Sequence, residues 1–281
     1  MSKQLLLSVQ KVNYYIKVFT SLDLNKKEIL ILHDISFNLK KGELICLLGP
    51  NGCGKTTLCK IIAGLKQPTK GKLFFSGSSY KKINKDIHKN ISMVFQNVDV
   101  SFIGDTLLED IKLYLFNLGI TNIKKRINFM NSLLNIEPLL RKPISTLSGG
   151  QKQLALIGEL ICVQPKLAIL DEPTSMLDSD KKEQVILALK KLKEKFKTAI
   201  LLVTHHINEA SKADRIMLML KGKITKFDVP NKILFNKPLL KSHNLWIPDF
   251  NKTIIKLSKI GLINNKKIIE YKELKSQLIK K

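Results

Sequence analysis

The sequence contains no apolar run long enough to cross a lipid bilayer. Its 281 residues are 44% hydrophobic and 25% charged, but runs such as residues 199–203 and 216–220 have only the length of a strand. A membrane-spanning helix needs about 18 or more consecutive apolar residues. The apolar stretch within residues 1–10 is likewise too short for a secretory signal. We therefore expect a protein of the cytosol, which would serve a membrane only from outside the lipid.

Cysteine is scarce, and its four positions exclude the usual cysteine-based sites. None of them lies in a Cys-x-x-Cys pair or in a His/Cys cluster with the spacing of a zinc site. We expect small, buried side chains in a reducing compartment. The residues concerned are Cys46, Cys53, Cys59 and Cys162.

Acidic residues and arginines are also few. Lysine and arginine together number 48 against 23 aspartates and glutamates, for a formal charge of +25, yet only three of the 48 are arginines. Proteins that read nucleic acids usually rely on arginine for bidentate contacts to bases and phosphates. We interpret the charge as a lysine-rich, solvated surface compatible with weak attraction to acidic lipid, and we expect no nucleic acid partner.

Strand-like and helix-like segments alternate along the chain. The segments with the composition of strands are residues 5–12, 29–39, 44–48, 167–170, 199–203, 216–220 and 224–227. The segments with helical spacing are residues 56–65, 107–118, 123–134, 151–162 and 180–196. This alternation predicts an α/β fold with a mainly parallel sheet. We expect one large domain over residues 1–230, with a helical block at about 105–160, and a lysine-rich, mostly helical tail over residues 231–281.

Residues 49–56 match the pattern G-x-x-x-x-G-K-[ST] of a phosphate-binding loop. Its glycines allow successive backbone N–H groups to point at phosphate oxygens, and the helix that follows adds positive potential at its N-terminus. We expect Lys55 to reach the β and γ phosphates of a nucleotide and the Thr56 hydroxyl to ligate Mg²⁺. The candidate nucleotide-binding residues of this segment are Gly49, Pro50, Asn51, Gly52, Cys53, Gly54, Lys55, Thr56 and Thr57.

Two carboxylates follow a second buried strand, residues 167–170. Ligands of open α/β sheets bind at the carboxyl ends of the strands, so Asp171 and Glu172 are expected beside the phosphate loop. Asp171 would hold the Mg²⁺ shell and Glu172 would polarise the attacking water. An apolar strand ending in Asp-Glu is common by itself, and only its place downstream of a phosphate loop favours the functional interpretation.

The segment Leu147-Ser148-Gly149-Gly150-Gln151 resembles the signature sequence of ATP-binding-cassette (ABC) ATPases. The order of motifs is also similar: phosphate loop, Gln96 after a strand, signature, carboxylate strand and then His205. The resemblance covers residues 5–228. It implies a P-loop NTPase of the ABC fold, with a RecA-like core, an N-terminal antiparallel β subdomain, a helical signature subdomain and a small C-terminal extension. It also implies an ATP hydrolase whose cofactors are ATP and Mg²⁺.

The same resemblance implies roles for the motif residues. The signature residues Ser148, Gly149, Gly150 and Gln151 would bind the γ-phosphate held by an opposite subunit, with ATP joining the dimer. Gln96, Thr56 and Asp171 would contact the Mg²⁺. Glu172, His205 and Gln96 would be catalytic, with His205 holding Glu172 and the water in line. The loop ending at Asp178 would cross the dimer interface. Leu154 stands where most relatives carry arginine, but no catalytic group is missing.

An aromatic ring of such ATPases usually stacks on adenine. Tyr14 and Tyr15 are the candidates in this sequence, with Ile16 as the alternative residue for the usual position. The alternative, that these tyrosines only pack on the sheet, is equally compatible with the sequence.

Residues 95–110 resemble the corresponding part of energy-coupling factor transporter ATPases, although Val98 and Ser101 replace their usual Pro and Gln. The tail adds to this resemblance through residues 239–242, Ile247, Pro248, Leu257 and Gly261. It implies a peripheral protein on the cytoplasmic face of the cell membrane, powering uptake of a vitamin or transition-metal ion. The implied partners are a second ABC ATPase subunit in a homo- or heterodimer, a membrane-embedded coupling subunit and a substrate-binding membrane subunit. The alternatives are another ABC importer or exporter, for example for cobalt, or a non-transport ABC ATPase.

Overall fold

A computed structural model describes residues 4–20, 23–83, 87–99, 101–246, 249–263 and 274–276. Ile247 and Pro248, which contributed to the resemblance of the tail, lie outside the described residues. Among the residues described, no helix is both long and apolar enough to cross a membrane.

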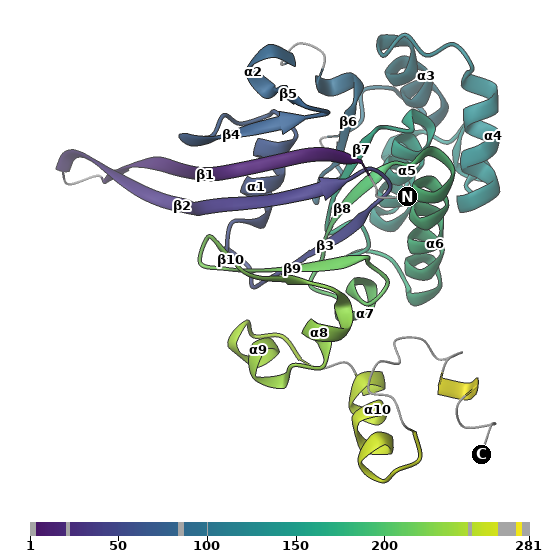
Figure 1. Cartoon of the computed structure of the whole chain (residues 1–281). Helices are drawn as coiled ribbons and strands as arrows, with labels where there is room; N and C mark the ends of the chain where they lie inside the picture. Colours follow the sequence, from purple (N-terminus) through teal and green to yellow (C-terminus); the bar gives the residue numbers. More distant parts are fainter. Residues whose placement is uncertain are drawn as a thin grey trace.

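A six-stranded sheet forms the centre of the molecule, in the order β10-β9-β3-β8-β7-β6 (Figure 1). All neighbouring strands from β9 to β6 pair in parallel, and only β10 is antiparallel to its neighbour β9. Every residue of β3, β7 and β8 is buried, which explains why these strands are continuous apolar runs rather than alternating ones. The strands are β3 (Leu44–Leu48), β6 (Ile91–Val94), β7 (Leu167–Asp171), β8 (Ala199–Val203), β9 (Arg215–Leu220) and β10 (Lys223–Asp228).

A second, antiparallel sheet has the order β2-β1-β4-β5. Its two long strands, β1 (Leu5–Thr20) and β2 (Asp23–Lys40), extend well beyond the segments predicted from sequence and project as a hairpin in Figure 1. Strand β4 (Lys70–Phe75) and the short β5 (Ser78–Ser79) were not predicted. The signal in β4 is weak because only Leu73 and Phe75 of its six residues are buried.

Three helices form a block at one side of the central sheet (Figure 1). They are α3 (Leu107–Asn117), α4 (Ile123–Leu134) and α5 (Gly149–Val163). The start of α3 is fixed by a capping box, in which Thr106 and Glu109 satisfy each other's backbone N–H groups. The remaining helices are α1 (Lys55–Ile62), α2 (Tyr80–Ile83), α6 (Ser179–Phe196), α7 (Ile207–Ala210), α8 (Pro230–Leu234), α9 (Lys237–Ser242) and α10 (Asp249–Lys259).

The core has two main parts, one on each face of the central sheet. Alternate residues of β3 belong to different parts: Cys46 packs with the helical block, whereas Ile45 and Leu47 pack with α1 and the antiparallel sheet. All four cysteines are buried and free, as expected. Both faces of the sheet are therefore covered, which is the usual arrangement for parallel strands.

The beginning of the tail is part of the main body. Ile233, Leu234 and Leu240 join the core that contains the helical block. The buried His243 lies 2.6 Å from the Thr225 hydroxyl of β10 and so ties the end of α9 to the sheet. Helix α10 instead contributes to a small separate cluster of Ile254, Ile263 and Leu274.

The buried carboxylate of Glu43 is held at the edge of the core by Arg215. Arg215 Nε donates to Glu43 at 2.6 Å, its Nη2 donates at 3.0 Å, and its guanidinium lies 4.0 Å from the ring centre of Phe227. We expect Arg215→Ala to lower the free energy of unfolding by about 2 kcal/mol, because a buried charge loses its partner. Chemical denaturation would measure this. The exposed pair Lys17–Glu28 supplies the control: Lys17→Ala should change stability by less than about 1 kcal/mol, and equal effects of the two substitutions would contradict the prediction.

Candidate functional site

The phosphate loop connects the buried strand β3 to helix α1. Gly52 and Gly54 have positive φ values of 76° and 101°, which the loop can adopt because neither residue has a Cβ atom. The Lys55 side chain is buried and its Nζ donates to the carbonyl oxygens of Gly49 and Pro50, at 2.8 and 3.0 Å. The loop therefore holds a positive charge at its centre, and contact of Lys55 with nucleotide phosphates stays a prediction.

Thr56 and Asp171 meet between the phosphate loop and the end of β7. The Thr56 hydroxyl donates to Asp171 Oδ2 at 2.6 Å. Burial raises the pKa of Asp171 above its usual value, while the Thr56 hydrogen bond and the nearby Lys55 charge act in the opposite direction. These are two of the three residues expected at a magnesium ion.

Glu172 and His205 form the second pair at the same edge of the sheet. His205 Nδ1 lies 2.6 Å from Glu172 Oε2, and half of the His205 side chain is exposed while the Glu172 side chain is nearly buried. Glu172 has a positive φ of 54°, an uncommon conformation for a residue with a side chain. Its N–H donates to Val203 O at 2.9 Å, which fixes this turn to the end of β8.

His206 has a different environment from His205. The two rings lie 4.1 Å apart, and burial lowers the pKa of His206. Its Nε2 lies 3.4 Å from Lys182 Nζ of α6.

A cavity of about 380 Å³ joins Gln96 and Glu172, two of the three predicted catalytic residues, to the phosphate loop, whereas His205 does not line it. Gln96 reaches it from the segment after β6, and Ile31 reaches it from β2. The other residues that line it are Asn51, Gly52, Gly54, Lys55, Thr56, Thr57, Asp171 and Glu172. The structure thus brings together residues that the sequence could only assign one by one.

Neither candidate tyrosine lines this cavity. The Tyr14 hydroxyl accepts a hydrogen bond from Lys66 at 3.2 Å, and its ring packs against the core under the antiparallel sheet. Ile31 of β2 lines this cavity beside the phosphate loop. The structure therefore shows a packing role for Tyr14, and adenine stacking by either tyrosine stays a prediction.

The signature segment forms the start of α5. Ser148 Oγ accepts from Gln151 N at 3.3 Å, and Gln151 Oε1 accepts from Ser148 N at 3.0 Å, which makes a capping box. This shows a structural role for the Gln151 side chain that the sequence interpretation missed, although the spacing Ser-x-x-Gln contains the signal. None of residues 148–151 lines the phosphate cavity of the same chain.

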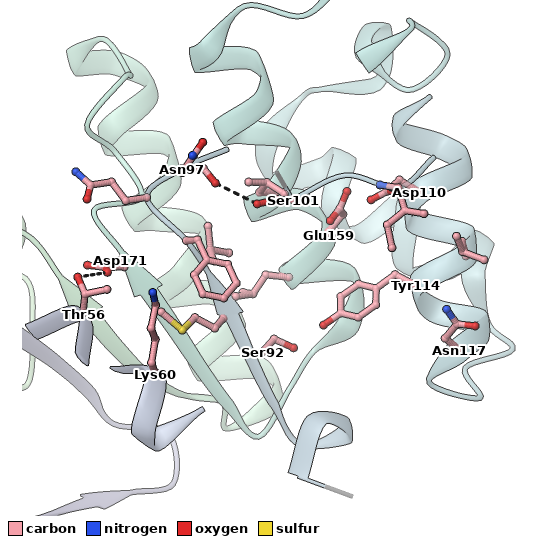
Figure 2. Close-up of a pocket in the computed structure, with 18 residues that line it drawn as sticks. Thr56, Lys60, Ser92, Asn97, Ser101, Asp110, Tyr114, Asn117, Glu159 and Asp171 are labelled. Carbon is pink, nitrogen blue, oxygen red and sulfur yellow. Dashed lines mark hydrogen bonds between the residues drawn. The ribbon is translucent and has the colours of Figure 1, made fainter. Parts of the chain in front are cut away.

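A larger groove of about 690 Å³ lies between β6, α3 and α5, and Figure 2 shows its residues. Thr56 and Asp171 lie at one end of the view and Asp110, Glu159 and Tyr114 at the other. Asp110 Oδ1 accepts from the N–H groups of Ile103 and Gly104, at 2.7 and 2.6 Å, and so fixes the loop before α3.

Glu159 is the most unusual polar residue of this groove. Its side chain is buried and its Oε1 has no hydrogen-bond partner among the described residues. Burial, together with the neighbouring Asp110, raises the pKa of Glu159 well above the usual value. No motif in the sequence marked this residue, because its environment depends on the packing of α5 against α3.

Gly49 is the position of the phosphate loop where a side chain fits least. A Cβ atom there would lie 2.3 Å from Met219 O and 2.9 Å from Cys53 Sγ. We expect Gly49→Ala to shift the loop, with a loss of about 1–3 kcal/mol of stability from overpacking and at least about a tenfold loss of nucleotide affinity. Thermal unfolding and binding of a fluorescent ATP analogue would measure both. Gly77→Ala is the control, because a Cβ there meets no atom within 4 Å. It should lose only about 1 kcal/mol of stability, the cost of a positive φ for a residue with a Cβ, and should bind nucleotide normally. Normal nucleotide binding by Gly49→Ala would contradict the prediction.

Comparison with known proteins identifies the family. Residues 32–175 match the model of the family described as ABC transporter. The energy-coupling factor transporter ATP-binding protein EcfA1 of Clostridium novyi is 36% identical over 233 residues, which cover 82% of this chain and 83% of the relative. The protein of the same name from Mycoplasmopsis synoviae is 36% identical over 231 residues, covering 81% and 85%.

Solved structures agree with the fold. The structure of cbiO1 from Clostridium perfringens, described as part of the ABC transporter complex cbiONQ, has a TM-score of 0.71 and 26% identity, with 90% of this chain and 99% of that chain covered. The dimeric ATP-binding cassette MJ0796, in a post-hydrolysis state bound to ADP and Pi, has a TM-score of 0.70 and 26% identity, with 80% and 98% covered. The chain therefore belongs to the ABC transporter family, in which it is an energy-coupling factor transporter ATP-binding protein.

Proposed function

We propose that this chain binds Mg²⁺-ATP in the 380 Å³ cavity and hydrolyses it against the signature segment of a second ATPase subunit. The observation that carries the proposal is the placement of two hydrogen-bonded pairs, Thr56–Asp171 and Glu172–His205, beside the phosphate loop. Phosphoryl transfer depends mainly on positioning and electrostatic stabilisation, and these groups can supply both.

The residues present fit a magnesium ion. Thr56 and Asp171 offer a hydroxyl and a carboxylate oxygen 2.6 Å apart, and Gln96 lines the same cavity with its amide. This small number of protein oxygens is typical of a Mg²⁺ site, because Mg²⁺ is usually held by one or two carboxylates together with substrate phosphates and water. When bound, the ion would neutralise charge on the phosphates.

Lys55 would bind the phosphates by exchanging partners. Its ammonium group now donates to the carbonyls of Gly49 and Pro50, within the curve of the loop. Phosphate oxygens are stronger acceptors than these carbonyls, because a hydrogen bond between charged groups is roughly twice as strong as a neutral one. The buried lysine is thus already positioned where the β and γ phosphates would lie.

Glu172 would polarise the attacking water, and His205 would hold the Glu172 carboxylate and the water in line. The 2.6 Å contact to His205 Nδ1 orients the Glu172 carboxylate, and because half of the His205 side chain is exposed, its Nε2 would bind the γ-phosphate. The proposed base, Glu172, and the group that orients it, His205, thus lie at the same edge of the sheet.

The second subunit is required because the signature lies outside the cavity of its own chain. Ser148 and the following glycines begin a 15-residue helix whose first N–H groups and positive potential are suited to bind an anion. The family relative MJ0796 is described as a dimer bound to ADP and Pi, which supports the same use here. The second subunit would be another copy of this chain or a related ATPase, and the tail would contribute to the contact.

The 690 Å³ groove is the proposed docking site for a cytoplasmic helix of a membrane-embedded coupling subunit. Exposed apolar side chains border it, among them Ile103, which is 83% exposed. Thr56, Gln96 and Asp171 line both this groove and the phosphate cavity, so a helix seated there would sense the nucleotide site. The chain would then work at the cytoplasmic face of the membrane, while a separate subunit recognises a vitamin or transition-metal ion.

We expect Glu172→Gln to reduce ATP turnover by about a hundredfold or more, because a general base contributes at least that much. ATP affinity should stay within about threefold, and the dimer should accumulate with ATP bound because the phosphate contacts remain. Phosphate release and size-exclusion chromatography would measure the two effects. Glu183→Gln, an exposed carboxylate on α6, is the matched control. Sustained turnover by Glu172→Gln would contradict the assignment.

A second prediction tests the groove. Ile103→Asp should weaken recovery of multi-spanning membrane subunits when the tagged chain is purified from gently solubilised membranes of its host, because a charge replaces an apolar contact. ATP hydrolysis by the chain together with its partner ATPase, without the membrane subunits, should be unchanged. Leu187→Asp makes the same change at a 52% exposed position of α6, outside the groove, and should not affect recovery. Mass spectrometry of the recovered proteins gives the readout, and recovery of ribosomes or DNA instead would favour a non-transport ATPase.

A further inference from the structure

Gln153 is a fully buried polar residue in the signature helix α5, and every part of its amide is engaged. Its Nε2 donates to Glu172 O at 3.1 Å and lies 3.3 Å from Ser175 Oγ, while its Oε1 accepts from Met176 N at 3.0 Å. The partners also fix the orientation of the amide. A reversed amide would place an oxygen against the Glu172 carbonyl and an NH₂ group against the Met176 N–H.

The backbone that Gln153 contacts belongs to the catalytic glutamate. Glu172 has the positive φ of 54°, which is unfavourable for a residue with a Cβ and persists only where surrounding contacts impose it. Two contacts from other elements hold it here: Glu172 N–H donates to Val203 O of β8, and Glu172 O accepts from Gln153 Nε2 of α5. Within the same turn, Ser175 N and Oγ also donate to Glu172 O, at 3.3 and 3.0 Å, and Ser175 Oγ is itself 3.3 Å from Gln153 Nε2. The direction of the Glu172 carboxylate therefore depends on the position of α5.

The other end of the same helix turn contacts the loop that follows Glu172. A Cβ on Gly149 would lie 3.0 Å from Met176 Sδ, and a Cβ on Gly150 would lie 2.9 Å from Met176 O. The signature segment, Gln153 and the loop at Ser175–Met176 thus form one closely packed unit, and α5 cannot shift without moving its hydrogen bonds to that loop.

We propose that Gln153 is a positioning residue that transmits the state of the signature segment to the backbone of Glu172 in the same chain. This rests on the proposed function, in which the signature binds the nucleotide of the opposite subunit. A signature helix drawn toward that nucleotide places Glu172 for hydrolysis in its own site. The two sites of a dimer are then coupled, because each reports its nucleotide to the glutamate of the other site.

The test compares substitutions of Gln153 with one of Gln184. Gln153→Glu keeps the shape and the acceptor for Met176 N–H but replaces both donors, and Gln153→Met removes the amide without adding a charge. Gln184 of α6 also donates its amide to a backbone carbonyl, that of Leu133, at 3.1 Å, and Gln184→Met is the matched control. The full chain, with its partner ATPase where one is required, is used throughout.

Both Gln153 variants should lower kcat about tenfold or more, because a small misplacement of a catalytic group has effects of this order. The affinity for ATP, measured with an ATP analogue that is not hydrolysed, should stay within about threefold. The Hill coefficient of hydrolysis should fall toward 1, whereas Gln184→Met should keep the wild-type kcat and Hill coefficient. A merely structural role of Gln153 would lower the melting temperature without separating kcat from affinity or removing cooperativity.

The outcomes separate the two proposals. Wild-type cooperativity that survives in both Gln153 variants, with unchanged kcat, would overturn the positioning role and leave the composite site intact. A Hill coefficient of 1 for hydrolysis by the wild type would contradict the proposal that the two composite sites of the dimer are coupled. Failure of both Gln153 variants to fold, while Gln184→Met folds, would make Gln153 a structural residue and would also overturn the inference.

Discussion

The parallel pairing of β3, β8 and β7 is the constraint on which the rest of the site depends. Leu47 pairs with Val203, and Val203 pairs with Asp171, so the three strands end at the same level of the sheet. The phosphate loop, the carboxylates and the loop with His205 therefore begin side by side, although the phosphate loop is more than 100 residues from the other two in sequence. Apolar contacts on both faces hold these strands, and the polar groups of the site lie only at their ends.

This arrangement places carboxylates in buried positions at the ends of the strands, where desolvation is costly. Asp171 and Glu172 are nearly buried, and Glu172 also has an uncommon backbone conformation. Each is compensated by a specific contact: Asp171 by the Thr56 hydroxyl, and Glu172 by His205 at its carboxylate and by Val203 and Gln153 at its backbone. Unfavourable backbone conformations in proteins cluster at functional sites. The one at Glu172 occurs at the residue that would activate water.

The parts of the molecule that could be predicted from sequence are those whose signal is local. Continuous apolar runs indicated the buried strands, and the glycine pattern before Lys55 indicated a phosphate loop, because both depend on neighbours in the chain. The strand β4 was missed because half of its residues are lysine or glycine. Gln153 was missed for a different reason: nothing in a helix sequence shows that an amide faces the carbonyl of a residue 19 positions later.

The two cavities show how binding and movement can be linked in one domain. Thr56, Gln96 and Asp171 line both the phosphate cavity and the groove of Figure 2, so the two spaces meet at the residues proposed to surround the magnesium ion. Helix α5 also contacts both the groove and the catalytic loop: Glu159 lines the groove, and Gln153 donates to the backbone of Glu172. A displacement of α5 would then change the groove and the Glu172 backbone together, because a packed helix moves as a unit. The same helix that would bind the opposite nucleotide is therefore placed to couple hydrolysis to a docked membrane subunit.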